Sequence, residues 1–95
     1  METARDFLVF HLGKMVRMIP ELKILYRHDA ATKQHLAIVL PREEYDCNRE
    51  FHAYEENLLL AFSGIYAGES LEIDSDESRL TRPEKVFEGE DYFDY

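Results

Sequence analysis

The chain has 95 residues, and its 11 Lys and Arg residues against 20 Asp and Glu residues give a formal charge of −9. This length allows one domain, because domains usually span about 100 to 200 residues, and an apolar content of 45% excludes a disordered chain. The charge argues against direct binding to nucleic acid or to an anionic membrane surface, both of which require clustered Lys and Arg.

The charge is unevenly distributed. Residues 1–40 hold six basic and four acidic side chains, a net +2, whereas residues 41–95 hold five and sixteen, a net −11. The longest apolar run, residues 58–62, is far shorter than the roughly 20 residues of a membrane span. The N-terminus lacks the features of a signal peptide, and the single Cys47 cannot form an internal disulfide. We therefore expect a cytoplasmic protein.

A first helix is predicted over residues 4–18. Thr3 and Asp6 have the spacing of a capping box, and Pro20 ends the helix. Apolar residues recur at helical spacing between them: Leu8, Leu12, Met15 and Ile19. Further apolar side chains widen this stripe, so we expect the helix to lie between two surfaces.

An antiparallel hairpin is predicted from residues 22–26 and 35–40. Both runs are rich in Leu, β-branched and aromatic residues, and a polar loop at about residues 29–33 separates them. Residues 36–40 are apolar at every position, which is typical of a strand that is covered on both faces. We expect this second strand to be central in the sheet.

A second helix is predicted over residues 48–66. Its apolar positions are Phe51, Tyr54, Leu58, Phe62 and Ile65. Asp46 or Asn48 is expected to be the N-cap and Gly68 the C-cap. Pro41 alternatively opens an earlier helical turn.

The C-terminal part is acidic. The apolar Leu71 and Ile73 alternate with acidic residues, which predicts a short strand over residues 71–73 at a sheet edge. Thr81, Pro83 and Glu84 have the spacing of a helix start, which predicts a short last helix that ends at Gly89. Residues 90–95 form an acidic, aromatic tail.

These elements predict a small two-layer α+β domain over residues 1–89, in the order α-β-β-α-β, with a short C-terminal helix and the tail at 90–95. Two helices cover only one face of a sheet. Because the central strand requires cover on both faces, the other face stays open unless a second copy of the chain, or the tail, closes it. We therefore predict a homodimer.

Catalytic and metal-binding patterns are weak. Cys47 precedes the second helix and His52 lies five residues on, but this separation does not place a nucleophile and its base on one helical face. His28 and His35 flank the hairpin loop, and they would supply two metal ligands at most. No short-spaced zinc-ligand pair occurs.

The other signatures of ligand sites are incomplete. Asp74 and Asp76 begin like a calcium loop, but Arg79 stands where glycine is required and Lys85 stands where a bidentate Glu is required. Phosphate-binding glycine motifs and a nucleophile elbow are absent. The sequence therefore predicts no catalytic residue, no cofactor and no metal site.

The remaining signal is the acidic surface. Ten residues are candidates for binding a partner: Glu69, Glu72, Asp74, Asp76, Glu77, Asp91, Tyr92, Phe93, Asp94 and Tyr95. The leading hypothesis is a small, non-enzymatic binding or regulatory protein that presents a negative surface to a basic protein. The alternatives are a DNA mimic that inhibits a DNA-binding protein, an enzyme or metal-binding domain using Cys47 or the histidines, and acidity that serves only solubility.

Overall fold

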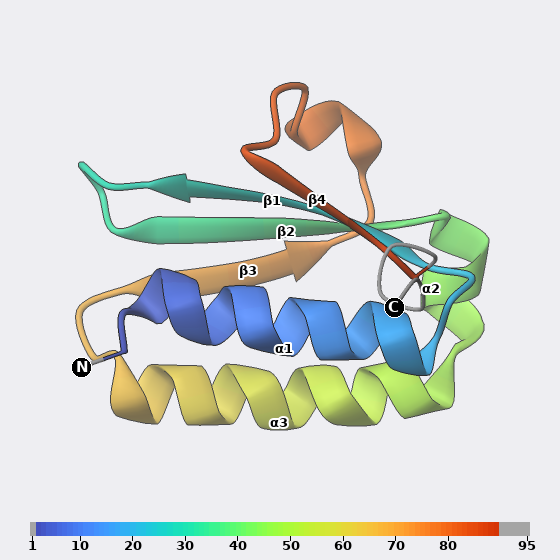
Figure 1. The fold of residues 1–95 in the computed structure, drawn as a ribbon, viewed down its shortest axis with the longest axis horizontal. Coiled ribbons are helices and arrows are strands. Elements are labelled where there is room, and N and C mark those ends of the chain that lie inside the picture. The colour runs from blue at the N-terminus through green and yellow to red at the C-terminus, as the bar shows by residue number, and fades with distance from the viewer. Residues whose placement is uncertain (1, 90–95) are drawn as a thin grey trace, which may run out of the picture.

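A computed structural model describes residues 2–89. Its elements are α1 (Ala4–Met18), β1 (Lys23–Asp29), β2 (Gln34–Leu40), α2 (Arg42–Cys47), α3 (Arg49–Ile65), β3 (Ser70–Asp74), the 3-10 turn η1 (Glu77–Arg79) and β4 (Lys85–Glu88). The two long helices α1 and α3 lie side by side along one face of a four-stranded sheet (Figure 1). The structure is thus the small α+β domain that the sequence predicted.

The sheet has the strand order β3-β2-β1-β4. Strand β1 pairs antiparallel with both β2 and β4, while β3 pairs parallel with β2. The hairpin, the inner position of β2 and the edge position of β3 are as predicted. The parallel pairing requires a crossover, which α2 and α3 provide between β2 and β3.

The local helix signals act as the sequence indicated. The Asp6 backbone N–H donates to Thr3 Oγ1 at 3.1 Å, and the Thr3 N–H donates to the Asp6 carboxylate, so both halves of the capping box form. Asn48 is the N-cap of α3, accepting the Phe51 N–H at 2.8 Å. The earlier helical turn at Pro41 also exists, as α2.

The prediction that Gly68 caps the C-terminus of the second long helix is wrong. The C-cap of α3 is Tyr66, and Gly68 lies two residues later, in the turn that leads to β3. Its φ of +100° is nevertheless a conformation that favours glycine, so the residue is required for the turn and not for the cap.

The predicted short C-terminal helix is wrong, because residues 85–88 form strand β4. The outer edge of β1 offers backbone donors and acceptors that need partners, and β4 supplies them while it buries Phe87 completely. Glu84 does not complete a capping box. Its backbone N–H donates to Tyr26 O, and its carboxylate accepts from the His28 N–H and from Arg5 Nε.

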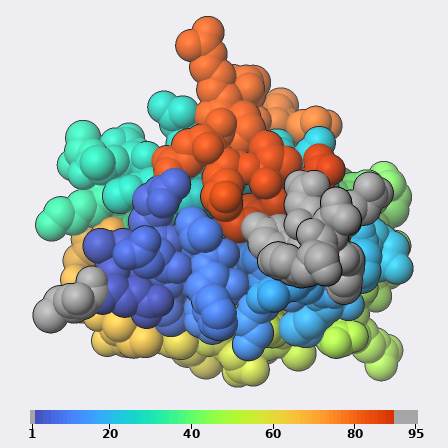
Figure 2. Space-filling model, viewed as in Figure 1, coloured from blue at the N-terminus to red at the C-terminus, as the bar shows by residue number. Residues whose placement is uncertain are grey.

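The main core lies between the helices and the sheet. Its largest fully buried side chains include Tyr26, Phe51, Phe62 and Phe87. Helix α1 also packs against β4, and Figure 2 shows these two segments beside each other on one face of the molecule.

The opposite face of the sheet is covered in part by the connection between β3 and β4. Leu80 from this connection packs on Leu25 and Ile38, and all three are buried. The chain itself therefore covers part of the sheet face that we expected to be open. This removes the original reason for predicting a dimer. The tail at 90–95, the other cover that we considered, lies outside the described residues.

Candidate functional site

Carboxylates from three separate segments meet at one end of the sheet, where β2 and β3 finish and α2 and α3 begin. We call the carboxylates that these segments carry at this end of the sheet the acidic end: Glu43, Glu44, Asp46, Glu55, Asp74, Asp76 and Glu77. Tyr45 shows the convergence, because burial first, and then Glu55, Asp74 and Asp46, raise the pKa of its hydroxyl. The Tyr45 hydroxyl donates to Glu55 Oε2 at 2.9 Å.

Two arginines lie within this group. Arg79 Nη1 and Nη2 bind the two oxygens of Glu72 at 2.6 and 2.9 Å, and Nη1 also lies 2.7 Å from Asp74 Oδ2. These bonds hold the pKa of both carboxyls below the usual range. Arg42 lies near Asp74 and Asp76 and lowers the pKa of each further. Two of the predicted partner-binding residues, Glu72 and Asp74, are therefore already paired within the chain.

The start of the calcium-like loop has a structural role. Asp76 Oδ1 accepts from the Ser78 N–H at 3.1 Å and from Ser78 Oγ at 2.7 Å, which caps η1. Within residues 2–89, Glu43, Glu44 and Glu77 have no ion pair, so they carry the uncompensated charge of the acidic end. The predicted tail residues 91–95 lie outside the described part of the chain.

Glu69 is separated from the other predicted residues, because it lies at the opposite end of the sheet, just before β3. Its Oε1 is 2.7 Å from Nε2 of His35, whose Nδ1 is 2.7 Å from the Tyr26 hydroxyl. The His35 side chain is fully enclosed, and burial first, then the proximity of His28, lowers its pKa against the opposing effect of Glu69. This balance favours a neutral imidazole.

His28 lies directly across the hairpin from His35, as the sequence suggested. The two residues pair in register, and their rings stack with centroids 4.0 Å apart. Nitrogen atoms of the two histidines and an oxygen of Glu69 all lie within 4.8 Å of one another. The sequence analysis found the two imidazoles and missed the carboxylate, because only the parallel pairing of β3 with β2 brings Glu69 there.

The Cys47 and His52 pair does not form a catalytic arrangement. Cys47 ends α2 and its exposed thiol lies 3.8 Å from Glu44 O. His52 Nδ1 lies 2.9 Å from Glu55 Oε1, and this hydrogen bond raises the pKa of His52. No hydrogen bond or ion pair joins the thiol and the imidazole in the described structure, so the predicted nucleophile lacks its base.

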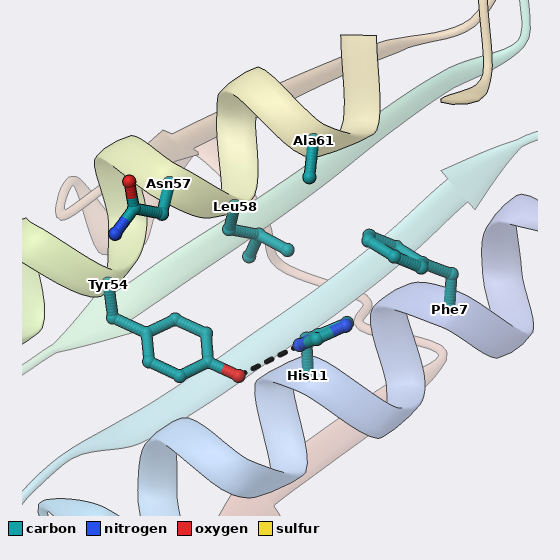
Figure 3. A pocket seen from close by; sticks show the side chains of 6 residues that line it. All are labelled: Phe7, His11, Tyr54, Asn57, Leu58 and Ala61. Atoms are coloured by element: carbon teal, nitrogen blue, oxygen red, sulfur yellow. Dashed lines mark hydrogen bonds between the residues drawn. The ribbon is translucent and has the colours of Figure 1, made fainter. Parts of the chain in front are cut away.

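A cavity of about 280 Å³ opens between α1 and α3 on the helical layer. Figure 3 shows Phe7 and His11 projecting into it from α1, and four residues lining it from α3: Tyr54, Asn57, Leu58 and Ala61. His11 Nδ1 and the Tyr54 hydroxyl lie 2.8 Å apart across the cavity. The lining is mostly apolar, so the cavity suits an apolar side chain better than a charged ligand.

The helical layer also exposes large apolar side chains. Phe10 is 54% exposed, Leu60 67% and Ile65 60%. The wide apolar stripe of the first helix was the signal of this surface in the sequence, and the structure adds the contribution of α3.

No helix in the described residues is long and apolar enough to cross a bilayer. No protein-family model, curated protein or solved structure matches the chain.

Proposed function

We propose that the protein is a small acidic, non-enzymatic binding protein that engages a basic protein partner through the acidic end. One observation carries this proposal: α2, α3 and the β3–η1 segment meet around Tyr45 and Arg42, and these segments carry the seven carboxylates of the acidic end. A cluster of one sign at one end of a small molecule steers an oppositely charged partner and helps to select it.

The arrangement supports a rigid surface. Arg79 fixes Glu72 and Asp74, Asp76 caps η1, and Tyr45 holds Glu55, so these carboxylates have set positions. Side chains that are already ordered lose less conformational entropy when they bind. The DNA-mimic hypothesis requires a long acidic face. The principal extents of 32 × 27 × 27 Å offer little elongation, so the acidic end supports a protein partner more directly.

The experiment compares two double variants of equal charge in quantitative affinity purification from lysate. Glu43→Gln with Glu77→Gln neutralises two unpaired carboxylates of the acidic end. Glu2→Gln with Glu56→Gln removes the same charge from exposed residues of α3 and the N-terminus. Basic partners should be retained by the wild type and the control and lost from the first variant, with binding that weakens as salt rises. Partners that are acidic or neutral, or equal losses in both variants, would contradict the proposal.

We also propose that the protein forms a homodimer through the α1–α3 face. Helix α1 carries Lys14 and Arg17 besides Arg5, which already pairs with Glu84, while α3 carries one Arg and three Glu residues. A two-fold axis would place α1 of one copy against α3 of the other, which pairs these opposite charges twice. The exposed Phe10, Leu60 and Ile65 would then be buried. Light scattering at micromolar concentration tests this arrangement, and a monomer would refute it.

A further inference from the structure

We propose that His28, His35 and Glu69 bind a divalent transition-metal ion such as Zn²⁺, at the end of the sheet opposite the acidic end. Two imidazoles and one carboxylate form a ligand set that Zn²⁺ accepts, with a fourth position left for water. This site is independent of the proposed partner-binding function, because it shares no residue with the acidic end.

The three side chains differ in how firmly the fold holds them. His35 is enclosed between Tyr26 and Phe62, with ring centroids 6.0 and 5.5 Å away, and it is the fixed ligand. His28 and Glu69 are partly exposed, so an ion can enter from solvent through them. Within residues 2–89 the His28 imidazole stacks on His35 and makes no side-chain hydrogen bond, whereas the His28 backbone N–H donates to Glu84. Its ring nitrogens are therefore open to a ligand.

Metal binding requires a small rearrangement. With ligand bonds of about 2.1 Å, tetrahedral ligand atoms lie about 3.4 Å apart. The present separations range from 2.7 Å, between His35 Nε2 and Glu69 Oε1, to at most 4.8 Å within the cluster. Glu69 must move away from Nε2, and His28 must rotate out of the parallel stack. Both are side-chain movements of partly exposed residues, while the enclosed His35 stays in place.

Tyr26 can support both forms of His35. An ionised Glu69 only accepts, so in the metal-free form Nε2 carries the proton, and neutral Nδ1 accepts from the Tyr26 hydroxyl. A metal on Nε2 requires the proton on Nδ1, which then donates to the same hydroxyl oxygen. This is the usual arrangement for a metal-bound histidine, whose second nitrogen donates to a partner that fixes the ring. The net number of protons on His35 does not change.

The experiment is calorimetric titration of the full chain with Zn²⁺ at neutral pH, together with His28→Ala, Glu69→Gln and a control, His52→Ala. His52 is the matched control because it has the same hydrogen bond to a glutamate, at 2.9 Å to Glu55, but no second imidazole on the same carboxylate. The wild type and the control should bind one Zn²⁺ per chain. The two site variants should bind at least about tenfold more weakly, the loss expected when a metal site loses a ligand or its support.

A second readout separates binding at this site from nonspecific uptake. Zn²⁺ should shift the NMR signals of the His28 and His35 rings and leave the ring signals of His52 and His11 unchanged. Circular dichroism checks that each variant is folded, and His28→Ala should be folded because the side chain is partly exposed. Absence of saturable binding by the wild type, or wild-type affinity in both His28→Ala and Glu69→Gln, would overturn the proposal. Loss of affinity only in His52→Ala would also overturn it.

Discussion

Gly89 directly follows β4, at a point where the backbone of another segment leaves no room for a side chain. A Cβ atom on Gly89 would lie 2.7 Å from Pro20 Cα and 2.9 Å from Val16 O, and both are backbone atoms. Since neither can rotate away, Gly89→Ala must push β4 from the C-terminal end of α1. Overpacking of this kind costs about 1 to 3 kcal/mol. For a domain of this size each kcal/mol lowers Tm by about 4 to 8 °C.

Gly64→Ala is the matched control. It adds the same methyl group within α3, where nothing lies within 4 Å of the new Cβ. Both substitutions restrict the unfolded chain to the same extent, so the comparison isolates the folded state. Thermal unfolding followed by circular dichroism should show a lower Tm for Gly89→Ala and an unchanged or higher Tm for Gly64→Ala, which can gain up to about 1 kcal/mol. If both variants raise Tm equally, the close packing of β4 on α1 is refuted.

Three further predictions concern the sites. Because the pKa of His35 is lowered in the fold, its contribution to stability is complete above the unfolded value of about 6.5 and is lost as pH falls through the folded value. In the His52→Ala variant, which removes the opposing contribution of the raised pKa of His52, the urea midpoint should therefore drop between about pH 7.5 and pH 5.5, and a rise would contradict this. Arg79→Gln should change the unfolding free energy by less than about 1 kcal/mol, since exposed ion pairs contribute little, and the added net negative charge should make the binding of a basic partner more strongly salt-dependent. Leu60→Ser should convert the proposed dimer to a monomer in light scattering and make Tm independent of protein concentration, because the side chain is 67% exposed in the single chain and would be buried only in the dimer; Ile73→Ser, on the core side of β3, should instead lower Tm at every concentration.

Much of the fold could be predicted because its signals are local. The bounds of α1 follow from the Thr3 capping box and Pro20, which act within a few residues of the helix ends. The hairpin follows from two apolar runs and the loop between them. Asn48 was one of two possible N-caps of α3, and only the geometry of the preceding α2 selects it over Asp46.

The C-terminal strand shows where local reasoning fails. Thr81, Pro83 and Glu84 have the residue types and spacing of a helix start. The segment of four residues that follows is too short to show whether its apolar residues recur at helical or at strand spacing. What decides the outcome is the free edge of β1, more than 50 residues earlier, together with the space that Phe87 fills in the core. Backbone pairing at a sheet edge and burial of an aromatic side chain outweigh a weak local helix preference.

The same distinction between local and distant information separates the parts of the candidate sites. In a hairpin, register follows from the loop, so the sequence could place His28 opposite His35. Glu69 joins them only because β3 returns parallel to β2 after two helices, and no pattern in the sequence specified that order. The acidic end is likewise assembled by the crossover, and Arg79 pairs Asp74 of this end and the neighbouring Glu72 from a turn that the sequence analysis did not anticipate. Net charge alone therefore overestimated the number of unpaired carboxylates on β3, because Glu72 and Asp74 are paired with Arg79. The unpaired negative charge of the acidic end lies on Glu43, Glu44 and Glu77.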